Sequence, residues 1–182
     1  SLREKVDKVV EEIKRKLDKL LEDSERVVEK SERDLRRWLK EAEEVVREIE
    51  KTLKELEKRA RDDRLRKIID EVRKRVERVL EEVEKIIDEL RKRSETVHRR
   101  NETIIRKVEE DVKRVRDRIE RVDKDVVEDL IRELEEIVRR VAEEVRTTIE
   151  DLRKINDEVR EKVKRLIEEL KKILDDVAEE VR

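Results

Sequence analysis

Three polar side chains in one short segment have the types and spacing of an acyl-transfer site. Ser94, His98 and Asn101 follow one another at intervals of four and three residues, so they lie on one face of a helix. A serine nucleophile, a histidine base and an orienting amide would suit that chemistry. Such a site also needs an oxyanion hole and a substrate pocket, and here the nearby backbone N–H groups are committed to a helix. We therefore favour a hydrogen-bonded core histidine and expect no enzyme.

His98 is the single histidine of the chain, and it could instead ligate haem or a metal ion. Zinc and di-iron sites need three or more inward-facing ligands from His, Asp and Glu. No Asp or Glu occupies a core position of the apolar pattern, so we expect no metal and no other cofactor. A pH-responsive role for His98 stays open, because protonation would place a charge in a buried site.

The composition removes the residues from which active-site loops are usually built. The 182 residues include no Gly, Pro, Cys, Met, Phe or Tyr. Glycine supplies positive φ and proline supplies rigid corners, so almost all of the chain must be helix. Without cysteine there is neither a disulfide nor a thiolate metal site.

Charge is abundant but balanced. Charged residues make up 59% of the chain, and 53 Lys and Arg face 55 Asp and Glu with the two signs interspersed. Nucleic-acid binding normally needs a one-sided basic surface, and membrane binding needs a basic face over a strongly apolar one or a long apolar run. We expect no nucleic-acid or membrane partner, and a soluble chain with no natural compartment that stays in the cytoplasm on recombinant expression.

Apolar residues return every 18 positions along the whole chain. Eighteen residues make five turns at 3.6 residues per turn, so this spacing predicts straight helices rather than supercoiled ones. The pattern changes phase twice, which divides it into three stretches. Representative rows are Leu2, Leu20, Trp38 and Leu56; Ile68, Ile86, Ile104 and Val122; Val127, Val145, Val163 and Val181; and Ile137, Ile155 and Ile173.

The phase changes predict three helices, over about 2–60, 64–121 and 126–181. Residues with capping potential stand at each start: Ser1 with Glu4, then Asp62 or Asp63, then Asp125 with Glu128. Connections this short force neighbouring helices to be antiparallel. The apolar stripe is roughly 120° wide, which suits a compact bundle. We predict an all-α, single-domain, antiparallel three-helix bundle whose helices are each about 87 Å long.

The spacing and the restricted Glu, Lys, Arg, Val, Ile and Leu alphabet resemble those of parametrically designed, untwisted helical bundles with an 18-residue repeat. The resemblance covers the whole chain. It implies a de novo designed protein of very high stability with no activity, and it carries over no functional residue.

Polar residues interrupt the apolar rows in the middle of each predicted helix. Ser24, for example, stands between Val6 and Ala42, and Asn101 stands between Val83 and Ile119. The full set is Ser24, Ser31, Ser94, His98, Asn101, Thr148 and Asn156. With antiparallel helices, all seven fall in a slab on the order of 11 to 16 Å thick, so we expect them to meet in one buried hydrogen-bond network. Trp38, one to two turns away, is expected to be a large core side chain.

We expect this network to favour one alignment of the three helices over other alignments. A slipped register or a misplaced third helix would bury these groups against Val and Leu, at about 1 to 3 kcal/mol for each unpaired group. We expect a monomeric structural scaffold that needs no partner. The alternative is an interaction module that forms homo-oligomers, although no second apolar face is visible. A single continuous helix is a third possibility, and the phase changes argue against it.

Overall fold

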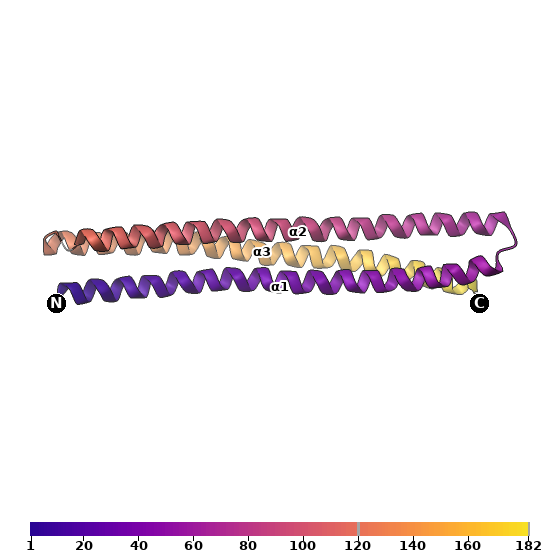
Figure 1. The fold of residues 1–182 in the computed structure, drawn as a ribbon, viewed down its shortest axis with the longest axis horizontal. Coiled ribbons are helices and arrows are strands. Elements are labelled where there is room, and N and C mark those ends of the chain that lie inside the picture. The colour runs from indigo at the N-terminus through magenta and orange to yellow at the C-terminus, as the bar shows by residue number, and fades with distance from the viewer. Residues whose placement is uncertain (120, 182) are drawn as a thin grey trace. The chain divides into compact units, whose positions relative to one another are not determined.

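In the residues that it describes, the computed structural model contains three long helices (Figure 1). They are α1 (Leu2–Arg59), α2 (Asp63–Ile119) and α3 (Lys124–Val181), of 58, 57 and 58 residues. The structure describes residues 1–119 and 121–181, without the side chain of Val181. Glu120, inside the helix predicted over 64–121, lies outside the described residues. Each observed helix end lies within two residues of the predicted one.

Side-chain and backbone caps explain where the helices begin. The Glu4 N–H donates to Ser1 Oγ at 3.4 Å and starts α1, and the Arg64 N–H donates to Asp62 Oδ1 at 3.0 Å and starts α2. The third cap was predicted wrongly: Asp125 lies inside the first turn of α3. The carbonyl of Asp123 accepts the first helical hydrogen bonds, each 3.1 Å long. No described residue has a positive φ, so the connections form without glycine.

The chain divides into two compact units, and segments of all three helices form each one. Unit 1 comprises Ser1–Lys30 and Arg93–Lys154, and unit 2 comprises Ser31–Lys92 and Ile155–Arg182. The unit 1 core is built from Val, Ile and Leu of all three helices, with Leu17, Ile105 and Val145 fully buried. The unit 2 core includes the buried Trp38.

Contacts between helices fix the chain directions within each unit. In unit 1, Asp7 of α1 pairs with Arg116 of α2, whereas the later residue Ser24 meets the earlier His98, so these helices are antiparallel. In unit 2, α1 runs parallel to α3, because Asp34 pairs with Arg160 and Glu41 with Lys171. This arrangement confirms the predicted all-α, antiparallel three-helix bundle.

Some members of the apolar rows are more exposed than the repeat predicts. Ile68, Val122 and Ile137 are 49%, 42% and 41% exposed. Of the other members of these rows, Ile86 and Ile155 are half-buried and Ile173 is buried. An apolar stripe about 120° wide places its outermost rows against only one neighbouring helix, so those positions stay partly open to solvent.

Candidate functional site

Four of the seven predicted polar residues meet inside unit 1, and we call them the Ser24 group: Ser24, His98, Asn101 and Thr148. Ser24 Oγ lies 2.9 Å from Nδ1 of His98, and the Asn101 amide donates to the same Oγ at 3.4 Å. Thr148 Oγ1 lies 3.0 Å from Asn101 Oδ1. The group therefore joins side chains from α1, α2 and α3 in one chain of hydrogen bonds.

The 18-residue rows explain why these side chains face one another. Ser24 and Asn101 replace apolar core residues of their rows, and both are fully buried. Thr148 replaces a leucine between Leu130 and Leu166 and is half-buried, as is His98. Because the rows already point toward the axis of the unit, short polar side chains at the same level are brought within hydrogen-bonding distance.

Ser24, His98 and Glu102 follow one another in the order of a catalytic triad, but they are not the trio that the sequence suggested, and the contact between His98 and Glu102 is longer than a hydrogen bond. The Nε2 atom of His98 lies 3.8 Å from Glu102 Oε2, and Glu102 in turn pairs with Arg106. A nucleophile must touch its substrate, whereas Ser24 has no solvent-exposed surface. Ser94 is also buried, and none of the described hydrogen bonds joins it to His98. The geometry therefore favours a structural hydroxyl over a reactive one.

A second polar cluster lies in unit 2, and we call it the Asp34 group: Asp34, Arg37, Asn156 and Arg160. The Asp34 carboxylate accepts hydrogen bonds from Arg37 at 3.2 Å and from Asn156 Nδ2 at 3.4 Å, and it pairs with Arg160 at 3.6 Å. Asp34 is only 6% exposed. The apolar rows contain no Asp or Glu, as predicted, but this carboxylate is buried at a position outside those rows.

Asp34 was missed because its row gives no signal. The residues 18 positions before and after it are Lys16 and Thr52, so the carboxylate does not interrupt an apolar row. Its burial comes instead from neighbours on α3. The guanidinium of Arg160 lies over the ring of Trp38, 5.9 Å from its centroid, and so covers this side of α1. Trp38 itself is buried, as predicted.

Two atoms of unit 2 are buried without a hydrogen-bond partner: Ser31 Oγ and Asn156 Oδ1. The expectation that all seven polar residues would bond to one another is therefore too broad. Asn156 bonds to the unpredicted Asp34, and the Ser31 hydroxyl bonds to none of the described residues. The rows identify which positions are polar, but they do not identify the rotamer or the partner of each one.

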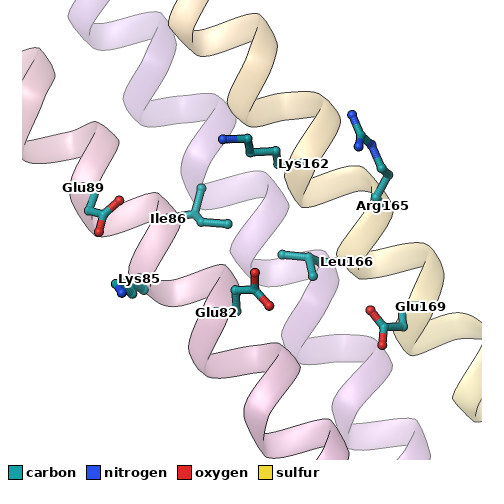
Figure 2. A pocket seen from close by; sticks show the side chains of 8 residues that line it. All are labelled: Glu82, Lys85, Ile86, Glu89, Lys162, Arg165, Leu166 and Glu169. Carbon is teal, nitrogen blue, oxygen red and sulfur yellow. The ribbon is translucent and has the colours of Figure 1, made fainter.

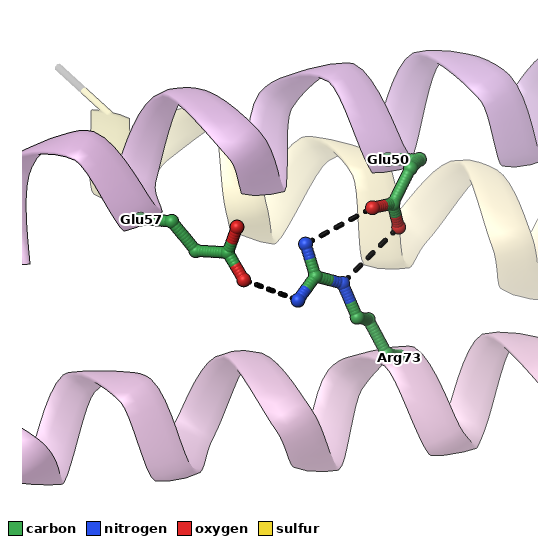
Figure 3. A network of polar contacts seen from close by, with 3 residues as sticks. All are labelled: Glu50, Glu57 and Arg73. Atoms are coloured by element: carbon green, nitrogen blue, oxygen red, sulfur yellow. Dashed lines mark hydrogen bonds and ion pairs between the residues drawn. The ribbon is translucent and has the colours of Figure 1, made fainter.

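Ionisable pairs between α1 and α2 differ between the units. In unit 1, burial, together with a hydrogen bond and repulsion from Asp18, raises the pKa of Glu109. In unit 2, Arg73 reaches from α2 to Glu50 and Glu57 of α1 (Figure 3). The hydrogen bond from Arg73 lowers the pKa of Glu57. One unit thus holds two carboxyl groups together, and the other holds a guanidinium between two carboxylates.

The grooves between helices are shallow and lined largely by charged side chains. In unit 2, Ile86 of α2 and Leu166 of α3 point toward one another in a groove of about 510 Å³ (Figure 2). Lys, Arg and Glu surround these two apolar side chains. In the described part of the chain, no three His, Asp or Glu side chains gather as metal ligands. No helix there combines the length and apolar character needed to cross a membrane.

Comparison with known proteins identifies no relative: no family matches the chain, and neither a curated protein nor a solved structure does.

Proposed function

We propose that this chain is a designed structural scaffold whose task is to fold as one monomeric three-helix bundle. The Ser24 group would specify how the helices align, and the apolar rows would supply most of the stability. Two features of the sequence support a designed origin: the absence of glycine and proline, and the 18-residue spacing repeated in three consecutive stretches.

One observation carries this proposal: the polar residues that interrupt three apolar rows bond to one another across three helices. Apolar rows that repeat every 18 residues match themselves after a shift of five turns, so they discriminate poorly between alignments. A buried polar group does not tolerate such a shift, because separating it from its hydrogen-bond partner costs about 1 to 3 kcal/mol. The few non-repeating residues therefore distinguish one alignment from the others.

The test replaces each member of the Ser24 group with an apolar residue of its own row. The variant carries Ser24→Val, His98→Leu, Asn101→Val and Thr148→Leu, after Val6, Leu80, Val83 and Leu130. We expect full helix content but more than one arrangement of α3 against the other two helices. Amide NMR spectra would then show several sets of resonances.

An independent readout uses chemical cross-linking as a ruler. Glu41 and Lys171, whose long side chains bring their charged groups 3.3 Å apart, are both replaced by cysteine in a chain that has none of its own. A bifunctional thiol reagent that spans the length of the two replaced side chains should cross-link the parent background almost completely, and the apolar variant should cross-link less. Equal yields with a single set of amide resonances in both would refute a role in specificity.

Self-assembly is the second candidate, and the exposed apolar side chains favour it. Ile68 and Ile86 of α2 belong to one row, and Ile86 lies with Leu166 in the groove of Figure 2. Sedimentation over a hundredfold range of concentration separates the two proposals. A constant single-chain mass supports the monomeric scaffold. A mass that rises with concentration and returns to one chain on Leu166→Glu would support assembly through this groove.

A further inference from the structure

The Thr148 hydroxyl has two acceptors but only one proton. Its Oγ1 lies 3.0 Å from Asn101 Oδ1 and 2.8 Å from the carbonyl oxygen of Val145 in its own helix. A hydroxyl donates one hydrogen bond at a time, so only one of these contacts is a donated hydrogen bond at any moment. The same restriction applies to Ser24, which lies between a ring nitrogen and an amide. The chain of hydrogen bonds therefore has a direction.

Glu102 sets that direction while His98 is neutral. The carboxylate faces Nε2 of His98, so a proton on Nε2 is favoured and Nδ1 is left as an acceptor. Ser24 then donates to Nδ1, the Asn101 amide donates to Ser24, and Thr148 donates to Asn101 Oδ1. Every member of the Ser24 group has a partner in this state, and the Val145 carbonyl does not need the threonine proton.

A proton on Nδ1 makes this direction impossible, because both ring nitrogens of an imidazolium are donors. Ser24 must then accept from His98 and turn its own proton toward Asn101. Asn101 can accept that proton only if its amide rotates by about 180°, which exchanges Oδ1 and Nδ2. The rotated NH₂ would point at Thr148 Oγ1, which must now be an acceptor. Thr148 can make this change because the Val145 carbonyl, 2.8 Å away, takes its proton.

We propose that the Ser24 group is a reversible hydrogen-bond relay, in which protonation of His98 rotates the Asn101 amide and redirects the Thr148 hydroxyl to the Val145 carbonyl. One proton from solvent enters the ring, and the remaining changes are rotations of two hydroxyls and one amide. Both states keep all four side chains hydrogen-bonded. Acidification therefore reverses the network instead of breaking it, and it carries the change from α2 through α1 to α3.

The charges around His98 are compatible with both states. Glu102 on α2 faces the ring and would form an ion pair with the imidazolium, although Arg106 shares its carboxylate. On α1, Asp23 and Glu25 flank Ser24 in the sequence, and both have solvent access. On α3, the neighbours of Thr148 in the sequence are Thr147 and Ile149, which are uncharged. The carboxylate of Glu102 is thus the negative group that lies against the ring and offsets the added positive charge.

The test is NMR spectroscopy of the whole chain labelled with ¹⁵N and ¹³C, at pH values about two units above and below ~6.5, the ordinary pKa of a free imidazole. Imidazole ¹⁵N shifts report the protonation of each ring nitrogen of His98. Nuclear Overhauser contacts report which way the Asn101 NH₂ points. We expect its strongest contact to move from the Ser24 β-protons at high pH to the Thr148 methyl group at low pH, so that the intensity ratio inverts.

Two serine variants supply the matched comparison. Ser24→Ala breaks the relay between His98 and Asn101, so the Asn101 contact should no longer change with pH although His98 still titrates. Ser94→Ala changes another buried serine of unit 1 that none of the described hydrogen bonds joins to the Ser24 group, and it should leave the inversion intact.

Several outcomes would overturn the relay. In the unmodified chain these are a doubly protonated ring with an unchanged Asn101 contact, a ring that stays neutral at the lower pH, and loss of the unit 1 tertiary resonances as His98 titrates. Persistence of the inversion in Ser24→Ala would also overturn it, because Asn101 would then respond to the charge without the serine.

Discussion

The two units are built from the same three helices, yet they bury polar groups in opposite ways. In unit 1 the Ser24 group uses neutral side chains that satisfy one another inside the core. In unit 2 the Asp34 group buries a carboxylate and holds it with two arginines. The side chains of Arg37 and Arg160 are 66% and 42% exposed, so this group reaches the surface.

The difference shows what burying a charge requires. A buried carboxylate needs several donors, and in unit 2 it takes the amide of Asn156 away from other partners. In the same unit, Asn156 Oδ1 and the Ser31 hydroxyl are buried without a hydrogen-bond partner. Neutral hydroxyls and amides both donate and accept hydrogen bonds, so a few of them can satisfy one another without a charged partner. We therefore expect the same polar-to-apolar substitution to have opposite effects in the two units.

The largest effect is expected from Ser24→Val in unit 1. Valine removes the partner of both His98 Nδ1 and the Asn101 amide, and each buried group left unpaired costs about 1 to 3 kcal/mol. We predict a loss of about 2 to 4 kcal/mol in the free energy of unfolding, measured by urea denaturation at pH 7.5. A loss below about 0.5 kcal/mol would mean that the group contributes little to stability.

The same substitution in unit 2, Ser31→Val, should stabilise the protein. The Ser31 hydroxyl is buried without a partner, and the residues 18 positions away are Ile13 and Ile49. Valine removes an unpaired polar group and adds apolar contact, so we predict a gain of about 1 to 2 kcal/mol in the same urea experiment. A loss instead of a gain would show that the hydroxyl has a partner and that the two units bury serine alike.

The carboxyl pair of unit 1 gives a smaller, pH-dependent effect. Folding raises the pKa of Glu109, so the protonated carboxyl group stabilises the folded state. This contribution is complete at pH values below the pKa of the unfolded chain, and it is lost as the pH rises through the higher pKa of the folded chain. Glu109→Gln removes the repulsion from Asp18, so we predict a gain of about 0.5 kcal/mol at pH 7. The gain should disappear at pH 4, where the native carboxyl is increasingly protonated. Equal gains at both pH values would contradict the assignment.

The smallest effect is expected where Arg73 joins α2 to α1 in unit 2. Arg73→Lys keeps the charge but loses the planar guanidinium, which bonds Glu50 through two nitrogens while its third nitrogen reaches Glu57, so we predict a slightly lower urea midpoint. Folding lowers the pKa of Glu57, so the ionised carboxylate stabilises the folded state. This contribution is present at pH values above the pKa of the unfolded chain, and it is lost as the pH falls through the lower pKa of the folded chain.

High salt and a matched lysine variant test whether the effect of Arg73→Lys comes from its ion pairs between two helices. Screening at about 1 M NaCl should reduce the difference between Arg73→Lys and the parent chain. Arg139→Lys is the control in unit 1, because Arg139 bonds to Glu136 within its own helix and joins no two helices. A midpoint that falls equally in both variants would show that bridging two helices gives Arg73 no advantage.

The sequence predicted the helices well, because the apolar rows and the caps are local signals. Val127, Val145 and Val163 of one row are fully buried, and Ser1 and Asp62 cap the helices that they were expected to cap. The third start was wrong because Asp123 and Asp125 both lie near the break, and sequence spacing alone did not separate them.

The polar contacts were only partly predictable. A polar residue in an apolar row marks a buried position, which correctly drew attention to Ser24 and Asn101. The burial of Asp34 was not predicted, because its row is polar throughout and the side chain is covered by Trp38 and by residues of α3. Which donor meets which acceptor depends on helix rotation and rotamers, and a repeat of 18 residues carries no information on either.

The position of Trp38 has a spectroscopic consequence. It is the single tryptophan, it lies in unit 2, and the cation of Arg160 lies over its ring, whereas the single histidine belongs to unit 1. Indole fluorescence therefore follows the melting of one unit, and the His98 ring protons follow the other. Recording both along one urea titration measures the cooperativity of the chain directly: coincident curves mean that helices continuous through both units melt as one, and separated curves give each unit its own free energy of unfolding.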